Sequence, residues 1–451
     1  MKLSHLIIAL VLLLGASACF GDDLADIKRA CFERGNFHKG IYWAAECAQE
    51  TFTAEQYHFT LTSVAPGAGF AALGLGTGSV QRIRRFEFMF AASAAMVPVE
   101  GSSVGQAQMT FALPTLSFMR VESPPHSTKQ KYGLRAINRR PIDDPVDAKM
   151  SVTLRVRRIN PREQDFYGLG PSTTRAGLAS YGLILTETYA GVNNPLTSWS
   201  SAGFDFSFLQ PRVTSSINAA PPIRSAYSEA TAPGLTVRDD FLHYEPYLLF
   251  RIPSHRSFFT TMRVGYAFYQ AMGDSRLSFQ RLSASSSTTI PLWIPAHNTS
   301  MNRGWFANAI CPDLRSGTRC SMGDLTLNAV VAASYTGAGS QVPFYFDQTL
   351  GGTDMNGNDT LRGFGNYRFR GPNTMLFQSE YRHYLWGPVG LLLFYDTGKV
   401  ALQRSDLSFD HLQHDFGPGL YFHIGNRELV RLYVGFGGEV SRLNKKFSGS
   451  F

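Results

Sequence analysis

The chain has 451 residues, a formal net charge of +8, 44% hydrophobic residues and only 17% charged residues. Soluble domains carry roughly 25% charged residues, so this composition argues against an ordinary soluble protein. Its Lys and Arg residues are scattered, whereas a nucleic-acid-binding domain clusters them in a patch, so no nucleic-acid partner is expected. The 42 glycines, 34 phenylalanines and 19 tyrosines fit an all-β wall with lipid on one side and water on the other.

The N-terminus is predicted to be a signal peptide over residues 1–18. A single lysine precedes the apolar run Leu6–Leu14, and a small-x-small cleavage sequence begins at Ala16. The run is shorter than the ~20 residues that a spanning helix needs. Cys19 follows the cleavage site directly, so acylation is an alternative, although lipoproteins favour Leu where Ala16 stands. Either way, the sequence predicts export.

Residues 22–54 are predicted to form a short helical segment that caps or plugs the barrel. Leu24, Ile27 and Cys31 fall on one face at helical spacing. A second short helix would contain Cys47, so a Cys31–Cys47 disulfide is expected to join the two in an oxidising compartment. The segment is shorter than an independent domain of at least ~50 residues. A frayed leader is the alternative.

Residues 55–451 show the alternation of a membrane-spanning antiparallel β-barrel. Apolar residues alternate with Ser, Thr and Arg at 150–157, and similar alternation returns at 261–268 and 429–436. An arginine facing a packed core is costly, but one facing a water-filled lumen is not. At about 25 residues per strand with its connection, the stretch predicts about 16 strands in the bacterial outer membrane. A soluble all-β protein with polar outer faces is the alternative.

Long loops are expected where Pro, Ser, Asn and Gly accumulate, at 121–148, 210–238, 270–324 and 340–373. Within the third of these, residues 280–289 (RLSASSSTTI) are interpreted as an exposed loop. The prediction is therefore a wall interrupted by four long connections.

Cys311 and Cys320 are expected to form a second local disulfide after export. Free thiols are the alternative for both cysteine pairs. Neither pair has the spacing of a zinc site, and no catalytic signature such as GxSxG or HExxH occurs in the chain. No metal, no cofactor and no enzymatic activity are therefore expected.

Three motifs follow one another in residues 350–398, and together they suggest a family. They are Leu361-Arg362-Gly363-Phe364, Glu380-Tyr381-Arg382 and Phe394-x-Asp396-x-Gly398. In order and spacing this set resembles the BamA/TamA-type barrels, also called the bacterial surface antigen family. The segment Asp165–Gly170 (DFYGLG) is similar to a mid-barrel motif of that family, and the terminal Phe451 resembles the aromatic residue that is read during barrel insertion.

The resemblance implies that a loop is locked inside the barrel. Glu380 and Asp396 are expected on neighbouring strands. If strand alternation turns both toward the lumen, two unpaired carboxylates lie there together, which is unfavourable. The resemblance assigns Arg362 to them as a bidentate partner. Gly363 is expected to permit a tight turn, and Phe364 to pack against the wall. A salt bridge that only stabilises the fold is the alternative. The predicted loop lock comprises Arg362, Gly363, Phe364, Glu380, Asp396 and Gly398.

The resemblance also implies a function, which is insertion or passage of polypeptides at the outer membrane. The expected partners are outer-membrane lipid and client polypeptides, which would meet the barrel at a weakly paired seam between its first and last strands. The final segment, Ser441–Phe451, carries Arg and Lys and is a poor lipid-facing strand. Residues 22–54 are too few for a POTRA module, so a member without POTRA domains is expected. A passive pore or structural barrel without a client is the alternative, and the oligomeric state is left open.

Overall fold

The structure is a computed structural model that describes most of the predicted barrel. The described residues are 57–62, 72–83, 86–97, 101–114, 149–217, 220–255, 258–295, 319–354, 357–386, 389–424, 427–437, 439 and 441–447. The signal peptide, the helical segment 22–54, Cys31, Cys47, Cys311 and Phe451 lie outside them. None of the described helices is both long and apolar enough to cross a membrane.

The wall is a meander in which each strand pairs antiparallel with the next. The sheet has 17 strands, but β6 (Gln164–Phe166) pairs only with β7, which leaves a wall of sixteen. These are β1 (Tyr57–Thr62), β2 (Ala72–Ile83), β3 (Phe86–Met96), β4 (Ser103–Pro114), β5 (Lys149–Asn160), β7 (Ala179–Thr197), β8 (Ser200–Thr214), β9 (Phe241–His255), β10 (Phe258–Ala271), β11 (Phe279–Pro295), β12 (Arg319–Thr336), β15 (Asn373–Trp386), β16 (Val389–Ala401), β17 (Gln413–Ile424), β18 (Arg427–Gly437) and β19 (Arg442–Phe447).

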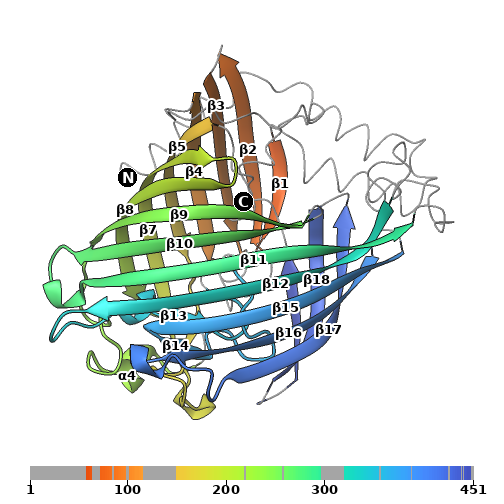
Figure 1. Ribbon diagram of the computed structural model, residues 1–451. Helices are drawn as coiled ribbons and strands as arrows, with labels where there is room; N and C mark the ends of the chain where they lie inside the picture. Colours follow the sequence, from red (N-terminus) through yellow and green to blue (C-terminus); the bar gives the residue numbers. More distant parts are fainter. Residues whose placement is uncertain are drawn as a thin grey trace.

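The strands curve around a central space, and the loops at one end carry the remaining elements (Figure 1). These are η3 (Arg175–Gly177), α4 (Ile223–Ala226), η4 (Ser275–Leu277), η6 (Phe344–Phe346), β13 (Gln348–Leu350), β14 (Phe369–Gly371) and η7 (Arg404–Asp406). We call this the cap end. The prediction of an all-β fold with an antiparallel barrel wall of about 16 strands is confirmed.

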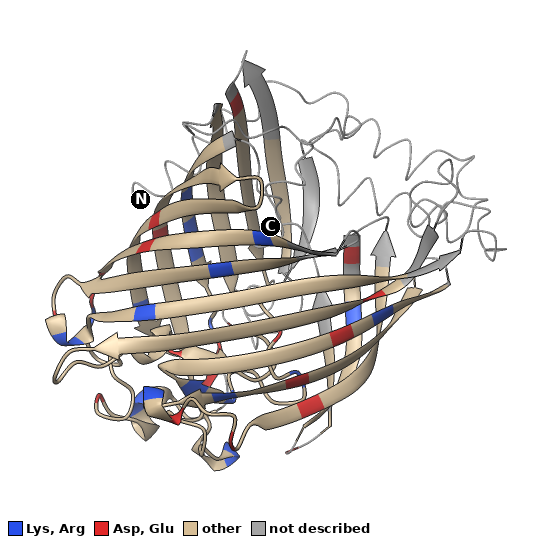
Figure 2. Ribbon diagram, in the orientation of Figure 1, with Lys and Arg blue, Asp and Glu red and all other residues tan. Residues whose placement is uncertain are grey.

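Side chains alternate between a polar interior and an apolar exterior. On β18, Arg431 and Tyr433 are 7% and 3% exposed, whereas Leu432 and Phe436 are 39% and 42% exposed. Charged residues on the strands are few, and many others lie at the cap end (Figure 2). Large apolar side chains in contact with water would be costly over so wide a surface. The apolar outer face and polar lumen are those of a barrel of the bacterial outer membrane.

The expected loop at 270–324 is wrong for most of its described part. Residues 280–289 lie inside β11, which pairs with β10 over residues 279–288 and with β12 over its whole length. The run of Ser and Thr resembles a loop in composition, but hydroxyl side chains are small and Thr is a good strand former. Neighbouring strands on both sides satisfy the backbone hydrogen bonds of this segment. Amino-acid composition alone does not indicate such pairing.

Within the residues that the structure describes, the two terminal strands are the shortest of the wall, at six residues each. β1 pairs with β2, and β19 pairs with β18 through Val430 to Gly435. No ladder joins β19 to β1 among the residues that the structure describes. We call the junction between these two strands the seam.

Candidate functional site

The connection from β12 to β15 folds inward and carries the predicted loop lock at its tip. Gly351 and Gly352 adopt φ values of +113° and +60°, which glycine tolerates best. Their amides donate to the Thr360 hydroxyl (2.9 Å) and the Leu361 carbonyl (2.8 Å). These bonds close a compact turn that presents Arg362 to the inner faces of β15 and β16.

Arg362 is 1% exposed and is held mainly by Asp396. Its Nε and Nη2 atoms donate to the two carboxylate oxygens of Asp396 at 2.7 and 2.8 Å, which is the bidentate geometry that guanidinium favours. Its Nη1 atom donates to Glu380, and its Cζ atom lies 3.9 Å from the centroid of the Phe394 ring. Burial opposes the charge, but Asp396 and Glu380 raise the pKa of Arg362 above its ordinary value. The group therefore stays charged.

Glu380 is shared by three arginines, two of which were not predicted. Besides Arg362, it accepts from Arg382 Nε at 2.7 Å and from Arg431 Nη1 at 3.0 Å. Arg431 on β18 is also paired with Glu428 at 2.7 Å. The network thus ties the loop to β15, β16 and β18 together. Arg382 belongs to the Glu380-Tyr381-Arg382 motif, but nothing local in the sequence marked Arg431 as a partner.

Gly363 lies in a turn in which the Phe364 amide donates to the Leu361 carbonyl at 3.2 Å, and it also lies at a close backbone contact. It is absent from the positive-φ glycines of the described chain. A Cβ atom there would lie 2.7 Å from Asp415 Cβ and 2.7 Å from the Gly437 amide nitrogen. On β18, a Cβ atom at Gly435 would lie 2.6 Å from Gly363 Cα. The missing side chains therefore let two backbones touch.

The other two lock residues also lie at close contacts. Phe364 is 2% exposed and packs edge-on against Phe369 with ring centroids 5.2 Å apart. A Cβ atom at Gly398 would lie 2.5 Å from the Met375 carbonyl on β15.

The loop tip also contacts the last strand. The Arg362 carbonyl accepts from Asn444 Nδ2 on β19 at 3.1 Å. The loop tip therefore reaches the last strand at the seam.

A second anchor of the same loop was not predicted, and two buried arginines form it. Arg370 Nη1 donates to the Phe344 carbonyl at 2.8 Å and Nη2 to the Tyr181 hydroxyl at 3.0 Å. Arg281 on β11 donates to the Phe346 carbonyl at 2.9 Å. The 3-10 turn η6 is thus held between a strand of the wall and β14.

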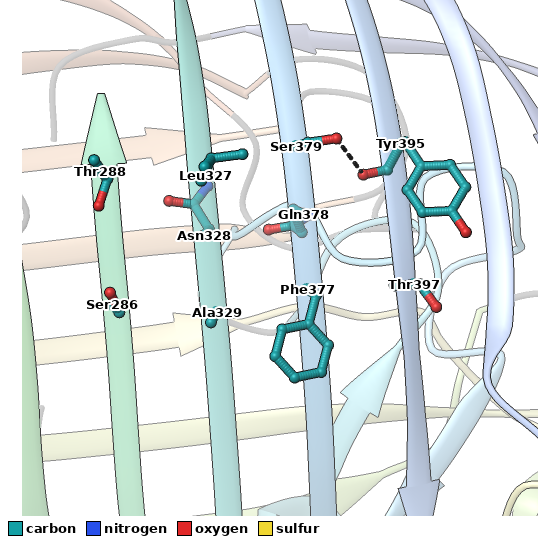
Figure 3. A pocket seen from close by; sticks show the side chains of 10 residues that line it. All are labelled: Ser286, Thr288, Leu327, Asn328, Ala329, Phe377, Gln378, Ser379, Tyr395 and Thr397. Atoms are coloured by element: carbon teal, nitrogen blue, oxygen red, sulfur yellow. Dashed lines mark hydrogen bonds between the residues drawn. The ribbon is translucent and has the colours of Figure 1, made fainter. Parts of the chain in front are cut away.

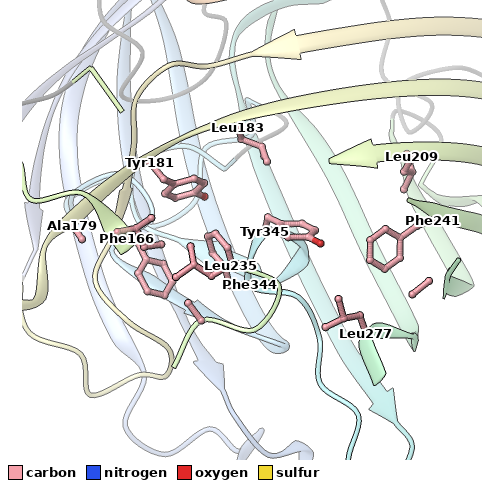
Figure 4. Packing of buried hydrophobic residues seen from close by; sticks show 13 residues of the cluster. Phe166, Ala179, Tyr181, Leu183, Leu209, Leu235, Phe241, Leu277, Phe344 and Tyr345 are labelled. Atoms are coloured by element: carbon pink, nitrogen blue, oxygen red, sulfur yellow. The ribbon is translucent and has the colours of Figure 1, made fainter. Parts of the chain in front are cut away.

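An apolar cluster surrounds this second anchor at the cap end (Figure 4). Phe344 packs edge-on against Phe166 and Tyr181, with ring centroids 5.3 and 5.1 Å apart. Phe166 belongs to the DFYGLG segment. In the same segment the Gly170 amide donates to the Arg370 carbonyl at 2.7 Å. The two regions that carry the family resemblance therefore meet in space.

Asp347 follows η6, and its buried carboxylate makes no hydrogen bond in the described structure. Burial raises its pKa to about 8, against the opposing effect of Arg370 and Arg281. An acid whose pKa is raised on folding binds its proton more tightly when folded, so it costs no stability below the unfolded pKa near 4. The cost then grows as the pH rises from about 4 to about 8.

We therefore expect Asp347→Asn to stabilise the barrel at about pH 8 and to change little at about pH 4. The measurement is the midpoint temperature at which the folded form is lost on a gel, at both pH values. Asp406→Asn, at an exposed acid of the cap, is the control. Its midpoint temperature should depend on pH as that of the wild type does. A midpoint that depends on pH equally in wild type and Asp347→Asn contradicts the prediction.

No cluster of His, Cys, Asp and Glu suited to a metal ion occurs among the described residues. Cys320 lies on β12, while its predicted disulfide partner lies outside the described residues. Both disulfides and the insertion signal at Phe451 stay predictions.

Comparisons with known proteins give a likeness of fold. No family model and no curated protein matches the chain. BamA from Haemophilus ducreyi lacking POTRA domains 1-3 is similar with a TM-score of 0.48 and 10% identity, over 86% of this chain and 68% of that one. CdiB from Escherichia coli is similar with a TM-score of 0.48 and 10% identity, over 86% of this chain and 60% of that one. CdiB from Acinetobacter baumannii is similar with a TM-score of 0.44 and 9% identity, over 84% of this chain and 55% of that one. The chain thus spans 55% to 68% of the length of these structures.

Proposed function

We propose that the chain is an outer-membrane assembly or translocation barrel that engages client polypeptides at the seam between β1 and β19. The observation that carries this proposal is the shortness of both terminal strands. Six residues at about 3.3 Å each reach about 20 Å, less than the roughly 30 Å hydrocarbon core. Strand edges cannot stay unpaired in hydrocarbon without several kcal/mol of cost per group. An incoming strand that adds to such an edge would satisfy it by β-augmentation.

The loop lock supports this proposal because it touches the seam from inside. Asn444 on β19 donates to the Arg362 carbonyl, and Glu439 before β19 pairs with Arg368 at 2.7 Å. β19 is thus held by the loop as well as by six ladder pairs with β18. Its position can be maintained while its outer edge accepts a client.

A passive pore or a structural barrel without a client is the competing function. A pore needs a continuous aqueous path through the cap end. There, a loop anchored by Arg281, Arg362 and Arg370 packs with an apolar cluster inside the wall. This packing favours the seam over the lumen as the route.

A photo-crosslinking amino acid at Leu443, which is 75% exposed on β19, tests the proposal. We expect ultraviolet light to trap newly exported outer-membrane polypeptides there in growing cells. The matched control carries the same group at Phe204, which is 46% exposed on β8, away from the seam. Equal or absent adducts at the two positions, with steady single-channel conductance of the purified protein, would favour the passive barrel.

A further inference from the structure

The outer wall contains a hollow of about 350 Å³ across β11, β12, β15 and β16 (Figure 3). It lies on the lipid-facing side, since the lining residues Leu327 and Tyr395 are 42% and 45% exposed there. Small side chains create the depth, and larger ones bound it. The main outward-facing lining residues are Ser286, Thr288, Leu327, Phe377, Tyr395 and Thr397.

The hollow is unusual for a lipid-facing surface because hydroxyl groups line it. The Thr397 hydroxyl oxygen is buried and has no hydrogen-bond partner in the described structure. The Tyr395 hydroxyl is 2.8 Å from His414 Nδ1, on the next strand. Polar groups in hydrocarbon are costly unless they are bonded. This lining therefore suits a ligand that brings some polarity as well as apolar bulk.

Two cationic side chains lie between the hollow and the cap end. Lys399 lies two residues beyond Thr397 on the same face of β16, which is about 7 Å. Its ammonium donates to the Asp410 carbonyl at 2.9 Å. Arg404 is exposed, and its Cζ atom lies 4.1 Å from the centroid of the Tyr335 ring. Tyr335 faces outward on β12, six residues or about 20 Å beyond Ala329 of the hollow toward the cap end.

The loop that carries Arg404 folds down against the outer wall. Phe409 of this loop, 75% exposed, stacks on Phe377 with ring centroids 5.8 Å apart. Three separate contacts, at Tyr335, Phe377 and Lys399, hold the loop in this place. These contacts fix the loop on the outer wall between the hollow and the cap end.

We propose that this hollow binds one membrane lipid with an anionic phosphate head group. A void on a lipid-facing wall forfeits dispersion contacts, so an acyl chain would fill it. The acyl chain of the lipid would lie between Leu327 and Phe377. The phosphate would sit toward the cap end, an acyl chain's length from the hollow, where Arg404 is available to donate to it and Lys399 adds positive charge. Charge complementarity at the membrane interface therefore selects an anionic over a zwitterionic lipid.

The site lies directly behind the loop lock. Gln378 and Ser379 at the hollow precede Glu380, and Tyr395 and Thr397 flank Asp396 along the same strand. The lipid would therefore contact the outer faces of the two strands whose inner faces hold Arg362. The site does not require a client, so it stands or falls independently of the proposed function.

Native mass spectrometry of the full chain tests this, after its release from nanodiscs of phosphatidylcholine and phosphatidylglycerol. The wild type should retain a single phosphatidylglycerol. Ala329→Trp, which fills the hollow, should lose it. Ala202→Trp, at an outward position on β8 away from the hollow, is the matched control and should retain it. Removing either cation, in Arg404→Gln or Lys399→Gln, should reduce retention about five-fold.

Each variant is first shown to be folded by its gel shift on heating. Retention of lipid by Ala329→Trp at the wild-type level would overturn the site. Equal retention of phosphatidylcholine and phosphatidylglycerol by the wild type would overturn the assignment of the head group. Loss of the lipid from Ala202→Trp would also count against the proposal, since the hollow would then not be its location.

Discussion

Arg362→Ala is expected to destabilise the barrel by about 3–5 kcal/mol, the cost of breaking a buried ion pair by removing one partner. The largest loss should come from Asp396, which is 0% exposed and would exchange a bidentate charged partner for the neutral amide of Gln378, at 3.2 Å. Glu380 suffers less, because Arg382 and Arg431 still donate to it. The measurement is the temperature at which the folded form is lost on an unboiled gel.

Two further variants separate charge from geometry. Arg362→Lys keeps the charge but cannot bind Asp396 with two parallel bonds, so an intermediate midpoint is expected. Combining Arg362→Met with Asp396→Asn should recover part of the loss, because no carboxylate is then stranded beside the missing guanidinium. Arg276→Ala, at an exposed arginine of the cap, should melt as the wild type does. If Arg362→Ala also melts as the wild type does, the lock does not stabilise the barrel.

Gly435→Ala is expected to unseat the loop tip while leaving the wall paired. The new Cβ atom would lie 2.6 Å from Gly363 Cα and 2.7 Å from the Arg362 carbonyl oxygen. Both neighbours are backbone, which cannot swing aside as a flexible side chain can. Overpacking of this kind costs typically 1–3 kcal/mol, and the loop can avoid it only by leaving its site.

Trypsin detects this change because the loop carries its own cleavage points. Arg362 and Arg368 are 1% and 4% exposed in the seated loop, so the wild type should resist cleavage there. Gly435→Ala should be cut at these arginines under the same conditions. The control is Gly337→Ala in the same connection, where the nearest atom to a new Cβ is 3.6 Å away. Equal resistance of the two variants would show that close backbone contact is not needed.

The sequence predicted those parts of the molecule that have a local signal. Alternation along strands such as β18 gave the wall, and the three ordered motifs named residues that the structure brings together at Arg362. The second anchor could not be predicted because its partners are distant in sequence, with Arg370 and Tyr181 separated by 189 residues. The one local hint was Tyr367-Arg368-Phe369-Arg370, where two arginines stand among aromatic rings that favour cations. Composition misled at β11, whose Ser and Thr residues suggested a loop.

The contacts of the inward loop also say something about the order in which the protein folds. Arg368 bonds Thr173, 195 residues earlier in the chain, and Arg362 accepts from Asn444, 82 residues later. Loop closure over such separations is slow and yields nothing until both ends are in place. The loop therefore seats only after early and late strands have assembled around it. In a refolding time course, we expect resistance to trypsin at Arg368 to appear after the gel shift, and simultaneous appearance would contradict this order. Binding of the loop inside the barrel would then report that the strands of the wall have assembled.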